Sequence, residues 1–426
     1  MSSAAYPDSY YAATRNMEVA YPALQAEVEV DVCICGGGFT GIATALSLAE
    51  RGYSVAVLEQ HRIGWGASGR NGGQFIGGFS GDGEIIRQLG PAVRDLVWDI
   101  GWLGNTVITR RVAQYAIDCD LKFGYMDLAL KPRHMRAFEQ YHEELQRRGF
   151  GDSVRMVPGQ ELRSVIGSDA YIGGLIDNRS GHLHPLNLCL GEARAAAGLG
   201  VQLYENSAAL SLQEGGSGTL VRTAGGQVRA GAVVLAGNAY QQLRLGELRG
   251  QVFPAGSYIV ATEPLSAAEA AELNPLDMAF CDPNHVLDYF RLSADRRMLF
   301  GGRCNYSGRE PKSIRASIEP RMHRIFPQLR GKRIDYEWGG NIGIVLNRVP
   351  LLGRLGGSMY YALGYSGHGV NMTHASGEIL ADAIAGDTRK LELFERVRHR
   401  RIPLGRTLSS QLLAVGMLYY RLLDLV

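Results

Sequence analysis

A glycine-rich turn between two apolar strands lies near the start of the chain and limits the folds that are open to it. Residues 30–60 read VDVCICGGGFTGIATALSLAERGYSVAVLEQ, the order of a strand, a glycine turn, a helix and a second strand that ends in an acid. Gly36, Gly38 and Gly41 give the turn the spacing G-x-G-x-x-G, and Glu59 follows the second strand. This order is typical of a βαβ unit that binds a dinucleotide, with the N-terminus of the helix facing the pyrophosphate.

Each part of this unit has a separate task in binding a dinucleotide. Gly36 permits the tight turn, Gly38 lets the backbone approach a pyrophosphate, and Gly41 lets the helix pack closely against the strand. Glu59 is placed to accept hydrogen bonds from a ribose diol. The contacts expected in this unit are Gly36, Gly38, Phe39, Thr40, Gly41, Glu59 and Gln60.

Two further segments favour FAD over NAD as that dinucleotide. Residues 61–74, HRIGWGASGRNGGQ, follow the acid directly and suggest backbone laid against a large flat ligand; an ordinary flexible glycine loop is the alternative. Residues 360–386 form a second strand, glycine turn and helix, whose N-terminus suits the negative charge of a reduced flavin ring. The contacts expected in the two segments are Gly66, Ala67, Ser68, Asn71, Gly72, Gly73, Gln74, Gly364, Ser366, Gly367, His368, Gly369 and Val370.

At these segments the chain resembles the D-amino-acid oxidase superfamily of FAD-dependent amine oxidoreductases, and within it the γ-glutamylputrescine oxidoreductase-like proteins. The resemblance spans nearly the whole chain. Its motifs are typical of flavin amine oxidoreductases but do not name a substrate. They are DSYYAATRN (8–16), GWGASGRNGGQ (64–74), GHLHP (181–185), GYSGHGVNMT (364–373) and GMLYYRLLDLV (416–426).

The resemblance implies oxidation of a C–N bond, with hydride passing to flavin N5 and the imine then hydrolysing. It implies non-covalent FAD, because the members that attach the flavin use a cysteine or histidine that GASGRNGG lacks. Oxygen or a quinone would be the acceptor. Relatives that use oxygen have a lysine near N5, and no lysine lies in a flavin motif here. Four further cofactor contacts are expected between the motifs, at Ala208, Ala236, Gly237 and Gly340.

Contacts to the amine substrate are expected on one predicted strand and around the last glycine turn. Tyr289 and Arg291 are two residues apart on a strand and therefore share a face, so Arg291 could clamp a carboxylate. Alternatively, Arg291 pairs with an acid such as Asp288 or Asp295. His368 lies beside the ring or the substrate, or is a helix-entry histidine satisfied by backbone. Tyr365 and Trp338 complete the candidates, and no acid–base catalyst or metal ligand is expected.

The expected architecture is an α/β FAD-binding domain, Rossmann-like and of the glutathione-reductase type, plus an α+β substrate domain with a mainly antiparallel sheet. A chain of 426 residues is long enough for two cores. The FAD-binding domain is predicted to be discontinuous, over 28–82, 158–245 and 334–400, and the substrate domain covers 83–157 and 246–333. Residues 1–27 form an N-terminal extension and 401–426 an amphipathic C-terminal tail.

Composition excludes some classes of function. A net charge of +2 with scattered basic residues gives no reason to expect nucleic acid. The six cysteines show no zinc spacing, and no secretory segment is visible, so we expect a reducing, cytoplasmic setting. The C-terminal tail either docks on the FAD-binding domain or lies at a membrane surface and delivers electrons to a quinone. Two other functions stay open: a flavin-binding redox sensor without amine turnover, and an NAD-dependent dehydrogenase.

Overall fold

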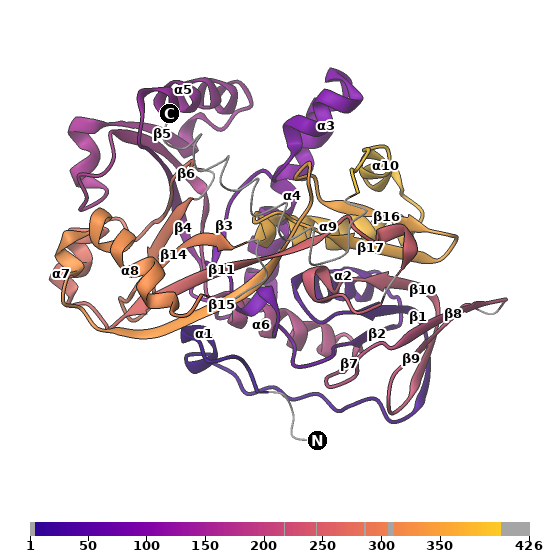
Figure 1. Ribbon diagram of the computed structural model, residues 1–426. Coiled ribbons are helices and arrows are strands. Elements are labelled where there is room, and N and C mark those ends of the chain that lie inside the picture. The colour runs from indigo at the N-terminus through magenta and orange to yellow at the C-terminus, as the bar shows by residue number, and fades with distance from the viewer. Residues whose placement is uncertain (1–4, 217, 244, 285–286, 306–310, 402–426) are drawn as a thin grey trace.

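Two β-sheets and the helices around them make up the fold (Figure 1). The computed structural model describes residues 5–401 except 217, 244, 285–286 and 306–310, with the backbone alone for 303–305. The predicted tail, 401–426, therefore lies outside the described residues apart from its first residue. The helices are α1 (Tyr10–Ala13), α2 (Phe39–Ala49), α3 (Asp82–Leu89), α4 (Arg94–Gln114), α5 (Pro132–Arg147), α6 (Pro185–Gly198), α7 (Ala267–Leu273), α8 (Ile314–Ile325), α9 (Gly369–Ile384) and α10 (Arg389–Glu395).

The first sheet has a parallel core built around the predicted βαβ unit. Its strands, in spatial order, are β16 (Leu351–Leu355), β17 (Met359–Leu363), β10 (Gln227–Leu235), β1 (Glu27–Cys35), β2 (Val55–Leu58) and β7 (Gln202–Tyr204), with β9 (Gly218–Arg222) on β10 and β8 (Ser211–Gly215) on β9. From β17 to β7 the neighbours are parallel. Cys33 and Cys35 share one buried face of β1 and are free thiols.

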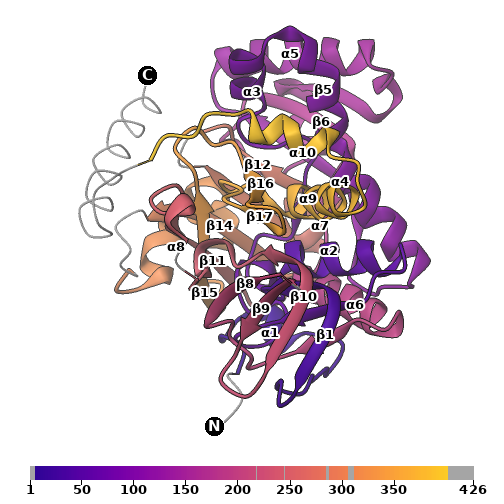
Figure 2. The same ribbon diagram turned by 90° about the vertical axis from the view of Figure 1, so that its right-hand side faces the viewer.

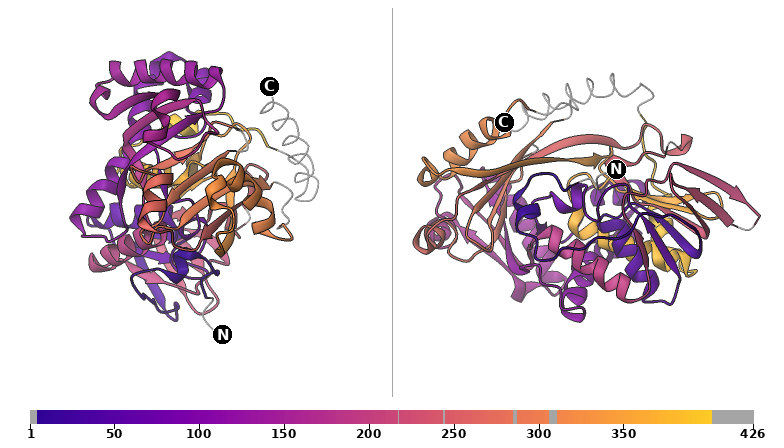
Figure 3. Two further views of the ribbon diagram at one scale, coloured as in Figure 1. Left: turned by 90° about the vertical axis from the view of Figure 1, so that its left-hand side faces the viewer. Right: turned by 90° about the horizontal axis from the view of Figure 1, so that it is seen from below.

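The second sheet is antiparallel except for the pairing of β12 with β4. Its strands, in spatial order, are β15 (Ile334–Ile344), β11 (Phe253–Thr262), β14 (Met298–Asn305), β13 (Asp288–Leu292), β12 (Ala279–Cys281), β4 (Lys122–Ala129), β6 (Gly173–His182) and β3 (Gln74–Phe75), with β5 (Val154–Pro158) on β6. One face is apolar, with the rings of Phe290 and Phe300 stacked at 5.5 Å, and it packs against Met322 of α8. Helices α7 and α8 lie at one end of the molecule and the β8–β9 hairpin at the other (Figure 3).

The predicted fold class is confirmed, and so are both predicted strand–turn–helix units, β1–α2 and β17–α9. The two sheets divide the chain differently from the predicted domain ranges. β6 and β15 belong to the second sheet, although 158–245 and 334–400 are predicted for the FAD-binding domain. β6 pairs with β4 and β5, and β15 pairs with β11, so their sheet is decided by partners distant in the sequence. The domain ranges themselves stay a prediction.

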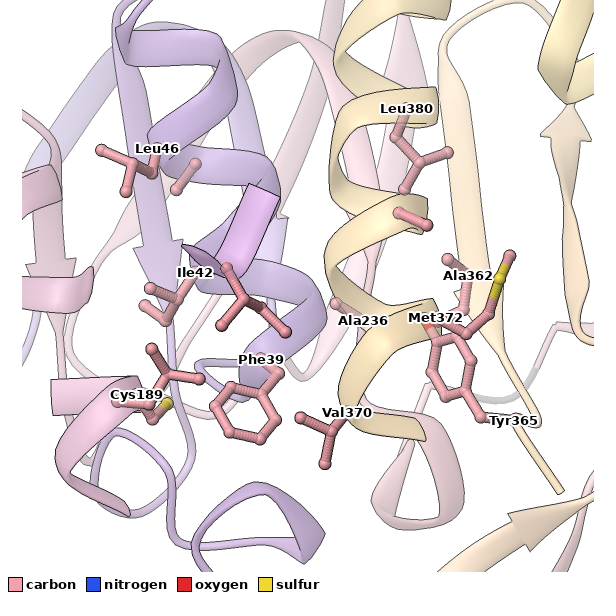
Figure 4. Packing of buried hydrophobic residues seen from close by; sticks show 14 of the residues in the cluster. Phe39, Ile42, Leu46, Cys189, Ala236, Ala362, Tyr365, Val370, Met372 and Leu380 are labelled. Atoms are coloured by element: carbon pink, nitrogen blue, oxygen red, sulfur yellow. The ribbon is translucent and has the colours of Figure 1, made fainter. Parts of the chain in front are cut away.

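Small residues let helices α2, α4 and α9 pack closely. Helices α2, α4 and α9 lie side by side (Figure 2). A Cβ on Gly377 of α9 would lie 2.8 Å from the Cβ of Ala43 in α2. A Cβ on Gly104 of α4 would overlap the backbone oxygen of Asn371 in α9. Figure 4 shows the apolar contact that results, with Phe39 at the start of α2 beside Val370 at the start of α9.

Gly41 offers a direct test of the first turn. A Cβ there would overlap the carbonyl oxygen of Gly36, so Gly41→Ala should lower the free energy of unfolding by about 3 kcal/mol and weaken retention of the dinucleotide. Gly83 is a matched control, because a methyl group on that exposed helical glycine would meet no atom within 4 Å. Gly83→Ala should instead stabilise the protein by roughly 0.5–1 kcal/mol. Thermal unfolding followed by circular dichroism measures both, and equal effects would contradict the assigned role.

Candidate active site

A cavity of about 600 Å³ lies between the two sheets and takes residues from both. This volume is in the range of small-molecule and cofactor sites. The predicted cofactor residues that line it are Gly36, Gly38, Phe39, Thr40, Glu59, Gln60, Gly66, Ala67, Ser68, Asn71, Gly72, Gln74, Ala208, Ala236, Gly237, Gly340, Ser366, Gly367, His368, Gly369 and Val370. Gly41, Gly73 and Gly364 are not part of the lining. The cavity thus brings together the three predicted segments, and contact with the cofactor itself stays a prediction.

The turn between β1 and α2 lines the cavity with glycine backbone. Gly36 has φ +123°, and a Cβ on it would lie 2.8 Å from the carbonyl carbon of Ala236, so the turn needs glycine there. The Glu59 carboxylate accepts hydrogen bonds from the backbone N–H groups of Gly37 at 2.7 Å and His61 at 2.8 Å. Burial raises the pKa of Glu59. A glycine backbone turn beside the hydrogen-bonded carboxylate of Glu59 fits the pyrophosphate and ribose of a dinucleotide.

The glycine loop after β2 is shaped by its own polar side chains. Ser68 Oγ accepts a hydrogen bond from the N–H of Phe39 at 2.8 Å, which ties the loop to the start of α2. Asn71 donates to the carbonyl oxygens of Ala67 and Ser68 and accepts from the N–H of Gly73. The loop is therefore ordered in this structure, with its backbone along the cavity, and the alternative of a freely flexible glycine loop is not supported.

The N-terminus of α9 also lines the cavity. His368 precedes the helix, and its Nε2 lies 3.1 Å from the carbonyl oxygen of Ile76. Burial lowers the pKa of His368, so the ring is neutral near pH 7. Tyr365 and Thr40 share a hydrogen bond of 2.7 Å between their hydroxyl groups, and burial raises the pKa of Tyr365 to about 12. The two substrate candidates, His368 and Tyr365, both line the cavity, and both also form hydrogen bonds with neighbouring protein groups.

The predicted role of Arg291 as a carboxylate clamp is wrong in this structure. Arg291 is 2% exposed and does not line the cavity. A guanidinium has five N–H donors. All five have an acceptor, and none of these is the carboxylate of Asp288 or Asp295 proposed as the alternative. The acceptors are the carbonyl oxygens of Gly72, Leu183 and Leu292, the Tyr11 hydroxyl and Nδ1 of His182. Arg291 therefore holds the glycine loop and the N-terminal segment in place.

Trp338 also lies away from the substrate space, contrary to the prediction. It is buried, does not line the cavity, and donates from Nε1 to the carbonyl oxygen of Arg70 at 3.0 Å. Its ring packs edge-on against Tyr11. Tyr289 does line the cavity, as predicted, and a Cβ on Gly72 would lie 2.6 Å from its ring. Of the pair expected on β13, only the tyrosine reaches the substrate space.

Several cavity residues were not predicted from the sequence. Arg70 lies within the glycine motif, and its guanidinium is 4.6 Å from the ring of Trp65 and donates to the Tyr240 hydroxyl at 2.8 Å. The motif itself could have drawn attention to Arg70. Seven of the other missed residues come from the second sheet and the segments that follow its strands, where no local motif marks them: Tyr125, Asp127, Ser257, Cys281, Asp282, Asn284 and Leu287.

Comparison with known proteins identifies the family. The model of the family described as FAD dependent oxidoreductase matches residues 31–383. The chain belongs to this family. It is 39% identical over 421 residues to gamma-glutamylputrescine oxidoreductase of Escherichia coli, covering 98% of both chains. It is 40% identical over 422 residues to the probable oxidoreductase OrdL of Haemophilus influenzae, covering 98% of this chain and 97% of that protein.

Solved structures share the fold at low sequence identity. Glycine oxidase from Bacillus cereus aligns with a TM-score of 0.71 at 21% identity, covering 88% of this chain and 100% of that one. L-proline dehydrogenase from P. horikoshii aligns with a TM-score of 0.72 at 20% identity, again covering 88% and 100%. The predicted resemblance is thus confirmed, and the protein is an FAD-dependent oxidoreductase. Among the described residues, no helix is both long and apolar enough to cross a membrane.

Arg291→Lys tests whether this residue holds the loop or binds a substrate. Lysine has three donors in place of five, so at least two hydrogen bonds are lost and the unfolding free energy should fall by about 3 kcal/mol. The dissociation constant for FAD should rise at least tenfold, while the preference between amines with and without a carboxylate stays unchanged. Fluorescence of released flavin and steady-state kinetics measure the two effects. The exposed Arg296→Lys serves as control. A selective loss of activity on carboxylated amines would instead support the prediction that Arg291 binds a substrate carboxylate.

Proposed function

We propose that this protein oxidises the C–N bond of an amine or amino acid. The observation that carries the proposal is the lining of one cavity, which includes the Gly36 turn, the N-terminus of α9 and Tyr289 of the second sheet. The relative from Escherichia coli is named for oxidation of gamma-glutamylputrescine, and more distant relatives for oxidation of glycine and sarcosine. A bound FAD would supply a hydride acceptor at N5, and the imine product would hydrolyse to a carbonyl compound.

The residues of the chain would then act mainly by holding and orienting. Glu59 and the turn at Gly36 would bind the ribose and the pyrophosphate. The N-terminus of α9 from Gly367 onward would face the negative edge of the ring, where a helix dipole is favourable. Tyr289 would form the far wall of the substrate space, because its ring packs against Gly72 of the glycine loop. We propose no acid–base catalyst, since a substrate amine that binds neutral needs none.

We propose that the flavin is bound without a covalent link. Two cysteines of the described residues line the cavity, Cys35 beside the dinucleotide turn and Cys281 on the second sheet. Burial raises the pKa of Cys281 well above its ordinary value, so it stays a protonated thiol and a poor nucleophile. Precipitation with acid should leave a colourless pellet and a yellow supernatant that contains FAD. A yellow pellet would contradict the proposal.

The electron acceptor is proposed to be oxygen or a quinone. None of the lysines, all of which are described, lines the cavity, and its cationic wall residues are Arg70 and Arg348. The lysine that some relatives use with oxygen has no counterpart among the residues that line this cavity, which supports testing the quinone first. We also propose a cytoplasmic setting, because Cys33, Cys35, Cys119, Cys189 and Cys281 are all free.

An anaerobic panel of amines tests the proposed activity. The purified protein should be yellow, and at least one amine from γ-glutamylated diamines, secondary amino acids and D-amino acids should bleach the flavin absorbance. Readmission of oxygen, or addition of a soluble quinone, should restore the absorbance and identify the acceptor. A yellow protein that no amine bleaches would overturn the proposal in favour of a redox sensor. A colourless protein that reduces NAD would favour the NAD-dependent dehydrogenase.

A further inference from the structure

Gln74 reaches the cavity from the second sheet. It lies on β3, in register with His182 of β6, and it lines the cavity. The glycine motif predicts Gln74 as a cofactor contact, but β3 belongs to the sheet that also carries Tyr289. Its position therefore allows contact with a substrate as well as with FAD.

The side-chain amide of Gln74 is held in one orientation. Its Nε2 donates to the carbonyl oxygen of Phe280 at 3.0 Å and to that of Phe290 at 3.5 Å. A backbone carbonyl oxygen can only accept a hydrogen bond, so the nitrogen of the amide must be the atom that faces these two groups. The oxygen, Oε1, is therefore the end of the amide that remains for another partner.

Oε1 of Gln74 has no hydrogen-bond donor among the residues that the structure describes, and it is not sealed off from the cavity. Two neighbouring donors on the cavity wall are already used. The thiol of Cys281 donates to the carbonyl oxygen of Asp282 at 3.4 Å, and the hydroxyl of Tyr125 donates to Asp127 at 2.7 Å. The described part of the wall thus offers an oriented acceptor that suits an N–H group of a ligand.

The proposed reaction needs an acceptor at the reacting nitrogen. As hydride leaves the carbon for FAD, the lone pair of the nitrogen forms the C=N bond, and the nitrogen gains positive charge. Its N–H group then becomes a stronger donor, so an acceptor beside it stabilises the transition state more than the bound amine. A neutral amide suits this task better than the carboxylate of Asp127, which would favour a protonated amine without the lone pair that the reaction uses.

We propose that Gln74 is a catalytic residue that contacts the substrate, with Oε1 accepting a hydrogen bond from the N–H group of the amine that is oxidised. The proposal rests on the proposed amine oxidation and moves Gln74 from the cofactor to the substrate. It requires that the reacting nitrogen carry at least one hydrogen atom. Primary and secondary amines should therefore be oxidised well and tertiary amines poorly.

Two amines that differ only at the nitrogen test the proposal on the wild-type protein. The first is the amine of the anaerobic panel that bleaches the flavin fastest, and the second is its tertiary derivative, with methyl groups in place of the N–H hydrogens. The rate of bleaching at low amine concentration, corrected for the neutral fraction of each amine, gives kcat/KM. The wild-type protein should prefer the amine with N–H by about 10- to 100-fold, the range of a hydrogen bond to a group that becomes charged.

Gln74→Met should reduce this preference. Methionine has a similar length but no amide oxygen, so only the amine with N–H loses a hydrogen bond, and the ratio of the two kcat/KM values should fall about tenfold. The dissociation constant for FAD, measured by fluorescence of released flavin, should stay unchanged. Gln251→Met is the matched control, because buried Gln251 also donates from Nε2 to a backbone carbonyl oxygen, that of Glu247 at 2.6 Å, but does not line the cavity. It should leave the ratio unchanged.

The outcomes separate this proposal from the one on which it depends. Equal wild-type rates on the two amines would overturn it while leaving amine oxidation intact, and this comparison needs no variant that folds. A ratio that Gln74→Met leaves unchanged would also overturn it, and a weaker affinity for FAD beside that unchanged ratio would return Gln74 to the cofactor. Absence of bleaching by every amine in the panel would overturn the proposed function itself.

Discussion

The close approach of α2 and α9 is the constraint on which the rest of the site depends. The two helices begin side by side at one cavity, where Thr40 and Tyr365 share a hydrogen bond of 2.7 Å, and Ala43 and Gly377 let their axes come together. A buried polar network ties α9 and α4 to α6 beside this contact. His374 of α9 lies 3.0 Å from Glu192 of α6, which also pairs with Arg111 of α4 at 3.5 Å. Burial alone would raise the pKa of Glu192, but His374 and Arg111 hold it below its ordinary value.

This arrangement gives the two sheets different tasks. The parallel sheet carries the turn at Gly36 at the carboxyl end of β1, where open α/β sheets bind their ligands. The antiparallel sheet turns its aromatic face, with Phe290 and Phe300, toward α8 and leaves a polar face for the cavity. Cofactor and substrate are thus handled by structures that can change independently. Such a division is consistent with a fold shared at 20–21% identity with glycine oxidase and L-proline dehydrogenase.

Most residues that local patterns predict for the cofactor line the cavity, whereas Arg291 and Trp338, predicted for the substrate, do not, and the reason is physical. Gly36, Gly38 and Glu59 act within one continuous βαβ unit, so their spacing carries their function. The role predicted for Arg291 was based on its own strand alone. Its hydrogen-bond acceptors, however, include Gly72 and Tyr11, which are 219 and 280 residues away. Asp127 and Cys281 become neighbours on the cavity wall through the parallel pairing of β4 with β12, which neither segment reveals alone. The sheet to which β6 and β15 belong likewise depends on pairing with strands distant in the sequence.

The hydrogen bond between Arg291 and Tyr11 has a consequence for how the molecule is made. Tyr6 also donates to the carbonyl oxygen of Ile63, so the first described residues lie against the loop that would cradle the flavin. During synthesis the chain leaves the ribosome from its N-terminus, and early segments generally fold first. Here Tyr11 must wait for its partner, since Arg291 emerges only after more than two-thirds of the protein has been translated, whereas the partner of Tyr6 emerges early. We therefore expect the cofactor cavity to be among the last parts of the newly synthesised chain to fold.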